Sequence, residues 1–86
     1  MAGGELKCNV LFFAAAAEAA GCRETELVVP SGSTVSDAFD LLATKHEQLI
    51  QLYALCAVAI DQQICSKDTQ LTDGCTLAFL PPVSGG

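Results

Sequence analysis

The sequence has 86 residues, of which 51% are hydrophobic and 16% are charged, so it can form one small folded domain and is unlike disordered chains. Its net charge of −6, with only four scattered basic residues, argues against binding of nucleic acid or of an anionic membrane surface. The same charge permits docking onto a basic partner, although solubility is an equally simple explanation.

The N-terminal residues lack the basic region and following apolar stretch that are typical of a signal peptide. The longest apolar runs, such as residues 10–17, are too short to cross a bilayer. We therefore expect a cytoplasmic protein that has no membrane partner.

The first structured segment shows the alternation of apolar and polar residues that predicts a β-strand. Its apolar side chains on one face are Leu6, Cys8, Val10 and Phe12. Leu11 and Phe13 add apolar side chains on the opposite face, so we expect this strand to end buried or at an interface.

Residues 14–20 contain six alanines around Glu18 and are followed by Gly21, which predicts a short helix with a glycine at its end. A low-complexity stretch without helical structure is the alternative. Residues 24–29 predict a second strand, which the Pro-Ser-Gly segment at residues 30–32 ends. The connection is short enough for the two strands to form a wide antiparallel hairpin.

The main helix is predicted to begin after Thr34, because Asp37 lies three residues later and completes a capping box. Lys45 and His46 lie at the expected C-terminal end, where positive charge suits the helix dipole. Residues 49–55 can add another turn or two of helix. The apolar residues at helical spacing define one buried stripe: Val35, Ala38, Phe39 and Leu42.

The second half of the chain predicts three further strands. Residues 56–60 are uniformly apolar and predict a buried strand, and Ile64 begins a short segment that pairs with it. Asp73 and Gly74 indicate a turn. Residues 76–80 are apolar on both faces, so we expect this last strand to lie at the centre of the sheet.

The predicted order is strand, strand, helix, strand, short strand, strand, which is typical of an α+β fold. If the first and last strands are both central, they pair in parallel, as in the ubiquitin-like β-grasp. We therefore expect a mixed sheet of about five strands packed on one main helix, with a short extra helix. Residues 1–80 would form this domain, and residues 81–86 a flexible C-terminal tail.

The five cysteines are odd in number and include no Cys-x-x-Cys pair, which fits neither a disulfide framework nor a zinc site. His46 is the single histidine, so we expect no metal site. We interpret the cysteines as free thiols in a reducing compartment, although one of them can handle sulfur if a cation activates it. They are Cys8, Cys22, Cys56, Cys65 and Cys75, of which Cys8 and Cys56 lie in apolar runs.

The C-terminal residues 81–86 read Pro-Pro-Val-Ser-Gly-Gly and form the candidate functional segment. Pro81 and Pro82 end the last strand because proline donates no hydrogen bond to a sheet. Extended, the tail reaches up to about 20 Å, enough to enter a partner's active site. Gly85 and Gly86 have no side chains to hinder this entry, although a pair of glycines also arises by chance or as an expression scar.

The terminal carboxylate of Gly86 is suited to acyl chemistry once an enzyme has activated it, for example as an acyl-adenylate formed from ATP. Attack by an amine on this adenylate gives an amide, as in protein tagging. Attack by a sulfur donor gives a thiocarboxylate, which can then act as a nucleophile. The residues themselves leave both outcomes open.

Several segments resemble the family of molybdopterin synthase small subunits. They are the ending from Leu80 to Gly86, the opening Val-Leu-Phe-Phe-Ala at residues 10–14 with Glu18 and Gly21, and the Leu-Thr-Asp-Gly of residues 71–74. The similarity runs from about Lys7 to Gly86, and the Pro-Pro lead is absent from sulfur carriers for thiazole or transfer RNA. Ala17 departs from the pattern, since many bacterial relatives carry arginine there.

The resemblance implies that Gly86 is adenylated by an activating enzyme that uses ATP and is then converted to a thiocarboxylate. Residues Pro81, Pro82, Val83, Ser84 and Gly85 would insert into the large catalytic subunit. The sulfur would go to cyclic pyranopterin monophosphate, and the large subunit would supply the acids and bases. This chain would be a sulfur-donating, non-catalytic subunit without a bound cofactor, in a heterotetramer.

A partner interface is predicted from the strand pattern and from the resemblance, at Phe13, Ile64 and Leu80. These apolar side chains can instead cover one another. Three further functions remain as alternatives: a ubiquitin-like modifier joined to lysines, another β-grasp sulfur carrier that serves thiazole synthesis or transfer RNA thiolation, and a plain interaction module whose tail is incidental.

Overall fold

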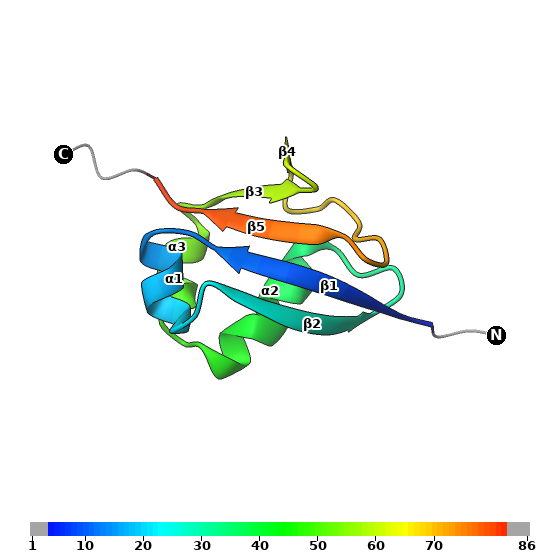
Figure 1. The fold of residues 1–86 in the computed structure, drawn as a ribbon, viewed down its shortest axis with the longest axis horizontal. Coiled ribbons are helices and arrows are strands. Elements are labelled where there is room, and N and C mark those ends of the chain that lie inside the picture. Colours follow the sequence, from blue (N-terminus) through cyan, green and yellow to red (C-terminus); the bar gives the residue numbers. More distant parts are fainter. Residues whose placement is uncertain (1–3, 83–86) are drawn as a thin grey trace.

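The computed structural model describes residues 4–82, which form a five-stranded mixed sheet and three helices (Figure 1). The elements in chain order are β1 (Glu5–Phe12), α1 (Ala15–Ala20), β2 (Glu24–Pro30), α2 (Val35–Lys45), α3 (Leu49–Tyr53), β3 (Ala57–Ile60), β4 (Gln63–Cys65) and β5 (Thr76–Leu80). The predicted α+β class and β-grasp topology are therefore confirmed.

The strand order is β2-β1-β5-β3-β4, so the first and last strands lie side by side, as predicted (Figure 1). β1 and β5 pair in parallel, from Asn9 with Thr76 to Phe12 with Phe79. The other neighbouring strands pair antiparallel, including the wide hairpin of β1 and β2. β5 has a paired strand on each side, which confirms its central position.

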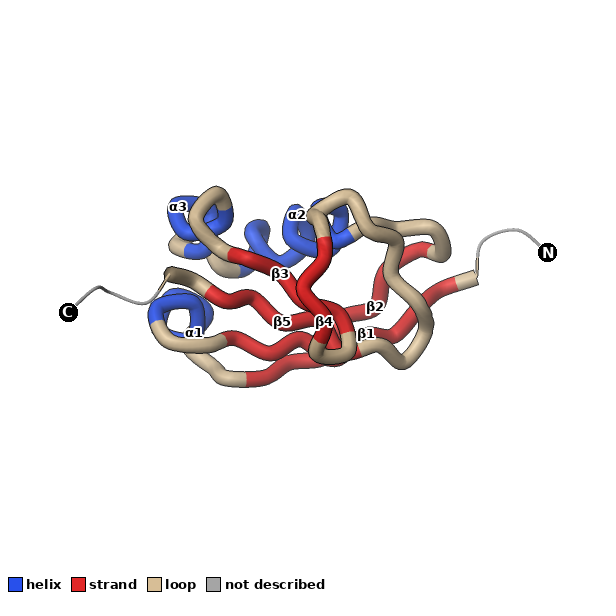
Figure 2. Tube along the Cα trace, turned by 90° about the horizontal axis from the view of Figure 1, so that it is seen from above, coloured by secondary structure: helices blue, strands red, loops and turns tan. Residues whose placement is uncertain are grey.

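The α2 helix lies on one side of the sheet, together with α3 (Figure 2). Its predicted capping box is present: Asp37 N–H donates to Thr34 Oγ1 over 3.2 Å, and Thr34 N–H donates to Asp37 Oδ2 over 2.9 Å. The predicted apolar stripe of α2 is buried against the sheet. The capped helix thus covers the core face of the sheet and leaves the opposite face open.

The helical turns predicted within residues 49–55 are present, but they form a separate helix, α3, so the structure has two short extra helices where one was predicted. Tyr53 at its end stacks on Phe39, with 3.8 Å between ring centroids. Lys67 Nζ lies 4.4 Å from the Tyr53 ring centroid and donates to the Tyr53 carbonyl oxygen over 2.8 Å. These tertiary contacts hold α3 in place, and the local sequence carries no sign of them.

Several strand boundaries differ by one residue from those predicted. β2 extends to Pro30, which an edge strand tolerates because one side of its backbone is unpaired. β3 begins at Ala57, whose side chain is exposed, so this strand is not uniformly buried. β4 begins at Gln63, one residue before the predicted start.

All five cysteines are free, as predicted. Cys8 and Cys56 are buried, which confirms the interpretation of both as core residues, and Cys75 is buried as well. Burial and a hydrogen bond with Cys75 raise the pKa of the Cys8 thiol from 9.0 to about 12. Burial also raises the pKa values of Cys56 and Tyr53. Within residues 4–82, no helix has the length and apolar character needed to cross a membrane.

We expect the free energy of unfolding to decrease as the pH rises above 9, under reducing conditions. The unfolded Cys8 thiol loses its proton near 9.0, whereas the folded one keeps it up to about 12, so deprotonation favours the unfolded chain in this window. Urea denaturation between about pH 8 and pH 10 measures the effect. The free energy of unfolding of the Cys8→Ala variant should decrease less steeply with pH. Equal slopes for both proteins would contradict the assignment of this effect to Cys8.

Candidate functional site

The base of the predicted tail is the end of β5, which is paired on both sides. Phe79 pairs with Phe12 of β1 and with Val58 of β3, and Leu80 pairs with Ala57. Pro81 is half-buried and Pro82 is exposed. The last predicted tail residues, Val83, Ser84, Gly85 and Gly86, lie outside the described residues, so their roles stay predictions.

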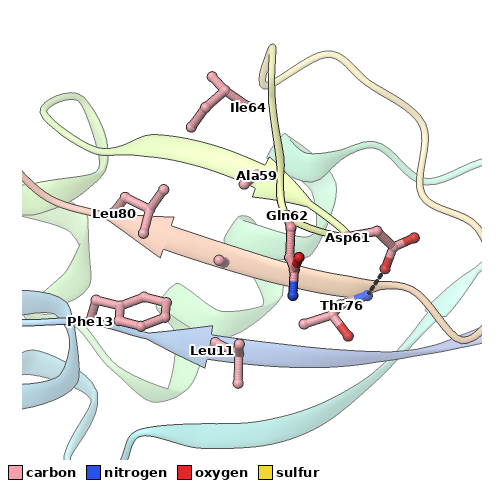
Figure 3. A pocket seen from close by; sticks show the side chains of 9 residues that line it. Leu11, Phe13, Ala59, Asp61, Gln62, Ile64, Thr76 and Leu80 are labelled. Carbon is pink, nitrogen blue, oxygen red and sulfur yellow. Dashed lines mark hydrogen bonds between the residues drawn. The ribbon is translucent and has the colours of Figure 1, made fainter.

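A shallow groove of about 460 Å³ lies on the face of the sheet opposite α2 (Figure 3). One row of paired residues crosses four strands here: Leu11 pairs with Ala78, Ala78 with Ala59, and Ala59 with Ile64. The two alanines lie in the middle of the row, and the larger Leu11 and Ile64 lie at its sides. Because alanine side chains are short, the sheet surface is hollowed along β5 and β3.

The two ends of the groove differ in chemistry (Figure 3). Phe13 and Leu80 lie at the end from which the tail leaves, and Thr76, Asp61 and Gln62 lie at the other end. Large apolar side chains are exposed here, since 46% of Phe13 and 68% of Ile64 are accessible to solvent. An exposed apolar surface of this kind is typical of a protein-binding site.

The structure thus brings the three predicted interface residues, Phe13, Ile64 and Leu80, into one groove. The prediction missed Ala59 and Ala78, although the period-two alternation of residues 76–80 could have placed Ala78 on the face of Leu80. It also missed the polar end of the groove.

The polar end of the groove depends on the tight turn between β3 and β4. Asp61 and Gln62 both have positive φ angles, of 50° and 72°, which non-glycine residues adopt at a cost. The Asp61 N–H donates to the Thr76 carbonyl oxygen, and Asp61 Oδ1 accepts from the Thr76 N–H, each over 2.9 Å. The turn is therefore fastened to the first residue of β5.

The groove contains no nucleophilic thiol, because none of the five free cysteines lines it. Over residues 4–82, no cluster of three or more His, Cys, Asp or Glu side chains could hold a metal ion. The side chains of this surface can bind another protein through apolar contacts and a few hydrogen bonds.

The sequence matches a family model, described as the ThiS family, over residues 10–86. It is 38% identical over 84 residues to a molybdopterin synthase sulfur carrier subunit of Mycobacterium tuberculosis, and the match covers 94% of this chain and 99% of that protein. The match from residue 10 to the last residue includes the groove and the tail.

The fold is similar to that of SAMP1 from Haloferax volcanii, with a TM-score of 0.83 and 31% identity, covering 93% of this chain and 99% of the other. It is also similar to a putative molybdopterin converting factor subunit 1 from Pyrococcus furiosus, with a TM-score of 0.82 and 29% identity, covering 91% and 99%. Both structures match nearly the whole described domain.

We expect Gln62→Gly to raise the free energy of unfolding by roughly 0.5–1 kcal/mol, because glycine adopts the positive φ of this position without strain. Urea denaturation measures the change. Gln62→Ala is the matched control, since it removes the same side chain and keeps the strain. An equal gain in both variants would show that backbone strain at Gln62 is not the cause.

Proposed function

The chain belongs to the ThiS family, and from this membership we propose that it is the sulfur carrier subunit of a molybdopterin synthase. The similarity to a sulfur carrier subunit over almost the full length of both proteins supports this function. The observation that carries the proposal is the arrangement at the end of β5. A strand paired on both sides leads directly into Pro81-Pro82, beside an exposed apolar groove and ahead of a terminal Gly-Gly.

The proposed chemistry takes place on the terminal carboxylate of Gly86. An activating enzyme joins this carboxylate to the α-phosphate of ATP, and pyrophosphate leaves. Hydrosulfide then attacks the carbonyl carbon and AMP leaves, so that a thiocarboxylate remains. With a persulfide as the sulfur donor, AMP also leaves, and a second thiol then cleaves the S–S bond to release the thiocarboxylate and a disulfide. Glycine suits both steps because it has no β-carbon to hinder attack.

The thiocarboxylate sulfur then attacks a carbon of cyclic pyranopterin monophosphate, the oxygen substituent on that carbon leaves with its bonding electron pair, and a thioester results. Water hydrolyses the thioester, the sulfur stays on the pterin, and the Gly86 carboxylate is restored. Repetition supplies the second sulfur of the dithiolene. We expect the acids and bases for these steps to come from the large catalytic subunit, as the similarity to molybdopterin synthase sulfur carrier subunits suggests.

We assign the groove as the docking surface for that large subunit. Phe13 and Leu80 lie at the end from which the tail leaves, so a protein bound there would be next to Pro81 and Pro82. The exposed Ile64 provides a further apolar contact at the side. Apolar side chains in the centre of an interface commonly supply most of its binding energy.

A ubiquitin-like modifier is the second candidate, and one observation favours it. SAMP1 from Haloferax volcanii is by name a small archaeal modifier protein, and its fold and length match those of this chain. A modifier would use the same adenylated Gly86 but would transfer the glycyl group to a lysine amine. Isopeptide-linked forms without a thiocarboxylate would favour this candidate.

Intact-mass measurement after co-expression with the activating enzyme tests the sulfur carrier function. We expect a mass increase equal to the exchange of one oxygen for one sulfur at Gly86. A variant without Gly85-Gly86 should show no increase and should unfold at the same urea concentration as the parent. Absence of the increase under conditions that load a known carrier would refute the proposal.

Ile64→Asp and Ile50→Asp form a matched pair that tests the docking surface. Both isoleucines are exposed, by 68% and 56%, but Ile64 lines the groove and Ile50 lies on α3, which is on the other side of the sheet (Figure 2). We expect Ile64→Asp to weaken binding of the large subunit at least about tenfold. Ile50→Asp should bind like the parent in isothermal titration calorimetry. Equal effects of the two variants would show that the groove is not the interface.

A further inference from the structure

Two buried thiols lie against each other between the central strands, at the end of β5 that is farthest from the tail. Cys75 Sγ donates a hydrogen bond to Cys8 Sγ, and the two sulfur atoms are 3.3 Å apart. Both side chains are almost inaccessible, at 0% for Cys8 and 2% for Cys75. Neither thiol lines the groove, so the proposed sulfur transfer leaves this pair without a role.

The backbone holds the two cysteines next to each other. The parallel ladder begins with Asn9 paired to Thr76, so Cys8 and Cys75 are the residues just before its first pair. The Asn9 N–H donates to the Cys75 carbonyl oxygen over 2.9 Å, and the Gly74 N–H donates to the Lys7 carbonyl oxygen over 2.8 Å. Hydrogen bonds thus flank the pair on both sides and set the separation of the two backbones.

We propose that Cys8 and Cys75 are a modification site, at which a hydroperoxide joins β1 to β5 by a reversible disulfide. Residues adjacent on neighbouring strands have Cα atoms about 5 Å apart, within the range of about 4.4–6.8 Å that disulfides require. To form the bond, the two sulfur atoms need to approach each other by little more than the difference between their 3.3 Å contact and the length of an S–S bond. The proposal does not depend on the sulfur carrier function.

The reaction balances with hydrogen peroxide as the oxidant. One thiol sulfur attacks a peroxide oxygen, the O–O bond breaks, and a sulfenic acid and one water form. The second thiol attacks the sulfenic sulfur, a second water leaves, and the S–S bond forms. Two S–H bonds are broken in total, and the two sulfurs together transfer two electrons to the peroxide.

The surroundings make this reaction slow in the closed native state. The raised pKa of Cys8 keeps its thiol protonated at neutral pH, and burial excludes the oxidant. Access requires opening of the turn before β5, which the Lys7 N–H fastens by donating to Asp73 Oδ1 over 2.9 Å. The cross-link would therefore form under sustained oxidation, and it would strengthen the domain by closing a long loop in the unfolded chain.

The location of the pair separates it from the proposed working end. Cys75 precedes β5 and the tail follows it, so about 17 Å of strand lies between them. The disulfide would tie the first strand to the last one without occupying the groove. A chain oxidised at this site would keep its docking surface free.

The test uses the full chain with Cys22→Ser and Cys65→Ser, because these two half-buried cysteines are the ones with access to oxidants. After treatment with hydrogen peroxide, peptide mapping by mass spectrometry should find Cys8 linked to Cys75, with the loss of two hydrogen atoms. The midpoint of thermal unfolding should rise by about 10 °C and return after dithiothreitol treatment.

Cys75→Ala in the same background is the control, and it should show neither the linked peptide nor the rise in midpoint. If the Cys75→Ala variant does not fold, Cys8→Ala serves as the control in its place. Peptide mapping of the protein that keeps both Cys8 and Cys75 requires neither control variant. Cys8 and Cys75 recovered unlinked, or oxidised separately to sulfinic acids, would overturn the proposal. A linked pair with an unchanged midpoint would overturn its stabilising role.

Discussion

The parallel pairing of β1 and β5 is the constraint on which the rest of this structure depends. It brings together two strands that are separated by most of the chain, and parallel neighbours require a long crossover between them. α2 supplies the part of that crossover that covers the sheet. Once the two strands are adjacent, β2 and β3 pair on their outer sides, and the C-terminal strand lies at the centre of the sheet.

The two faces of this central pair have different compositions and different roles. On the core face, the rings of Phe12 and Phe79 stack with 5.9 Å between centroids, and Phe39 of α2 meets Phe79 edge to face. On the open face, Ala78 leaves a hollow beside Leu11. Because side chains alternate along a strand, one short segment can both complete the core and form the floor of a surface groove.

Features of the structure that depend on residues close together in the sequence could be predicted, whereas those that depend on contacts between distant segments could not. The five strands, the capped α2 and the central position of β5 could be predicted, since local periodicity and capping residues determine them. The stacking of Tyr53 on Phe39 and the contact between Cys8 and Cys75 depend on strand register and helix placement. At the site, large exposed residues such as Ile64 were predictable, and alternation along β5 could have placed Ala78 on the same face as Leu80. The alanine floor as a whole was not predictable, because it also depends on the register that pairs Ala78 with Ala59.

The proposed function requires the chain to present its terminus in a defined direction. Pairing of Leu80 with Ala57 fixes the last residue of β5, and the proline rings of Pro81 and Pro82 restrict the next two φ angles. The orientation of these residues is therefore established when the domain folds. A partner that docks in the neighbouring groove does not bear the entropic cost of ordering Pro81 and Pro82. More of the favourable free energy of its contacts therefore contributes to binding. The central strand thus couples the stability of the fold to the orientation of Pro81 and Pro82.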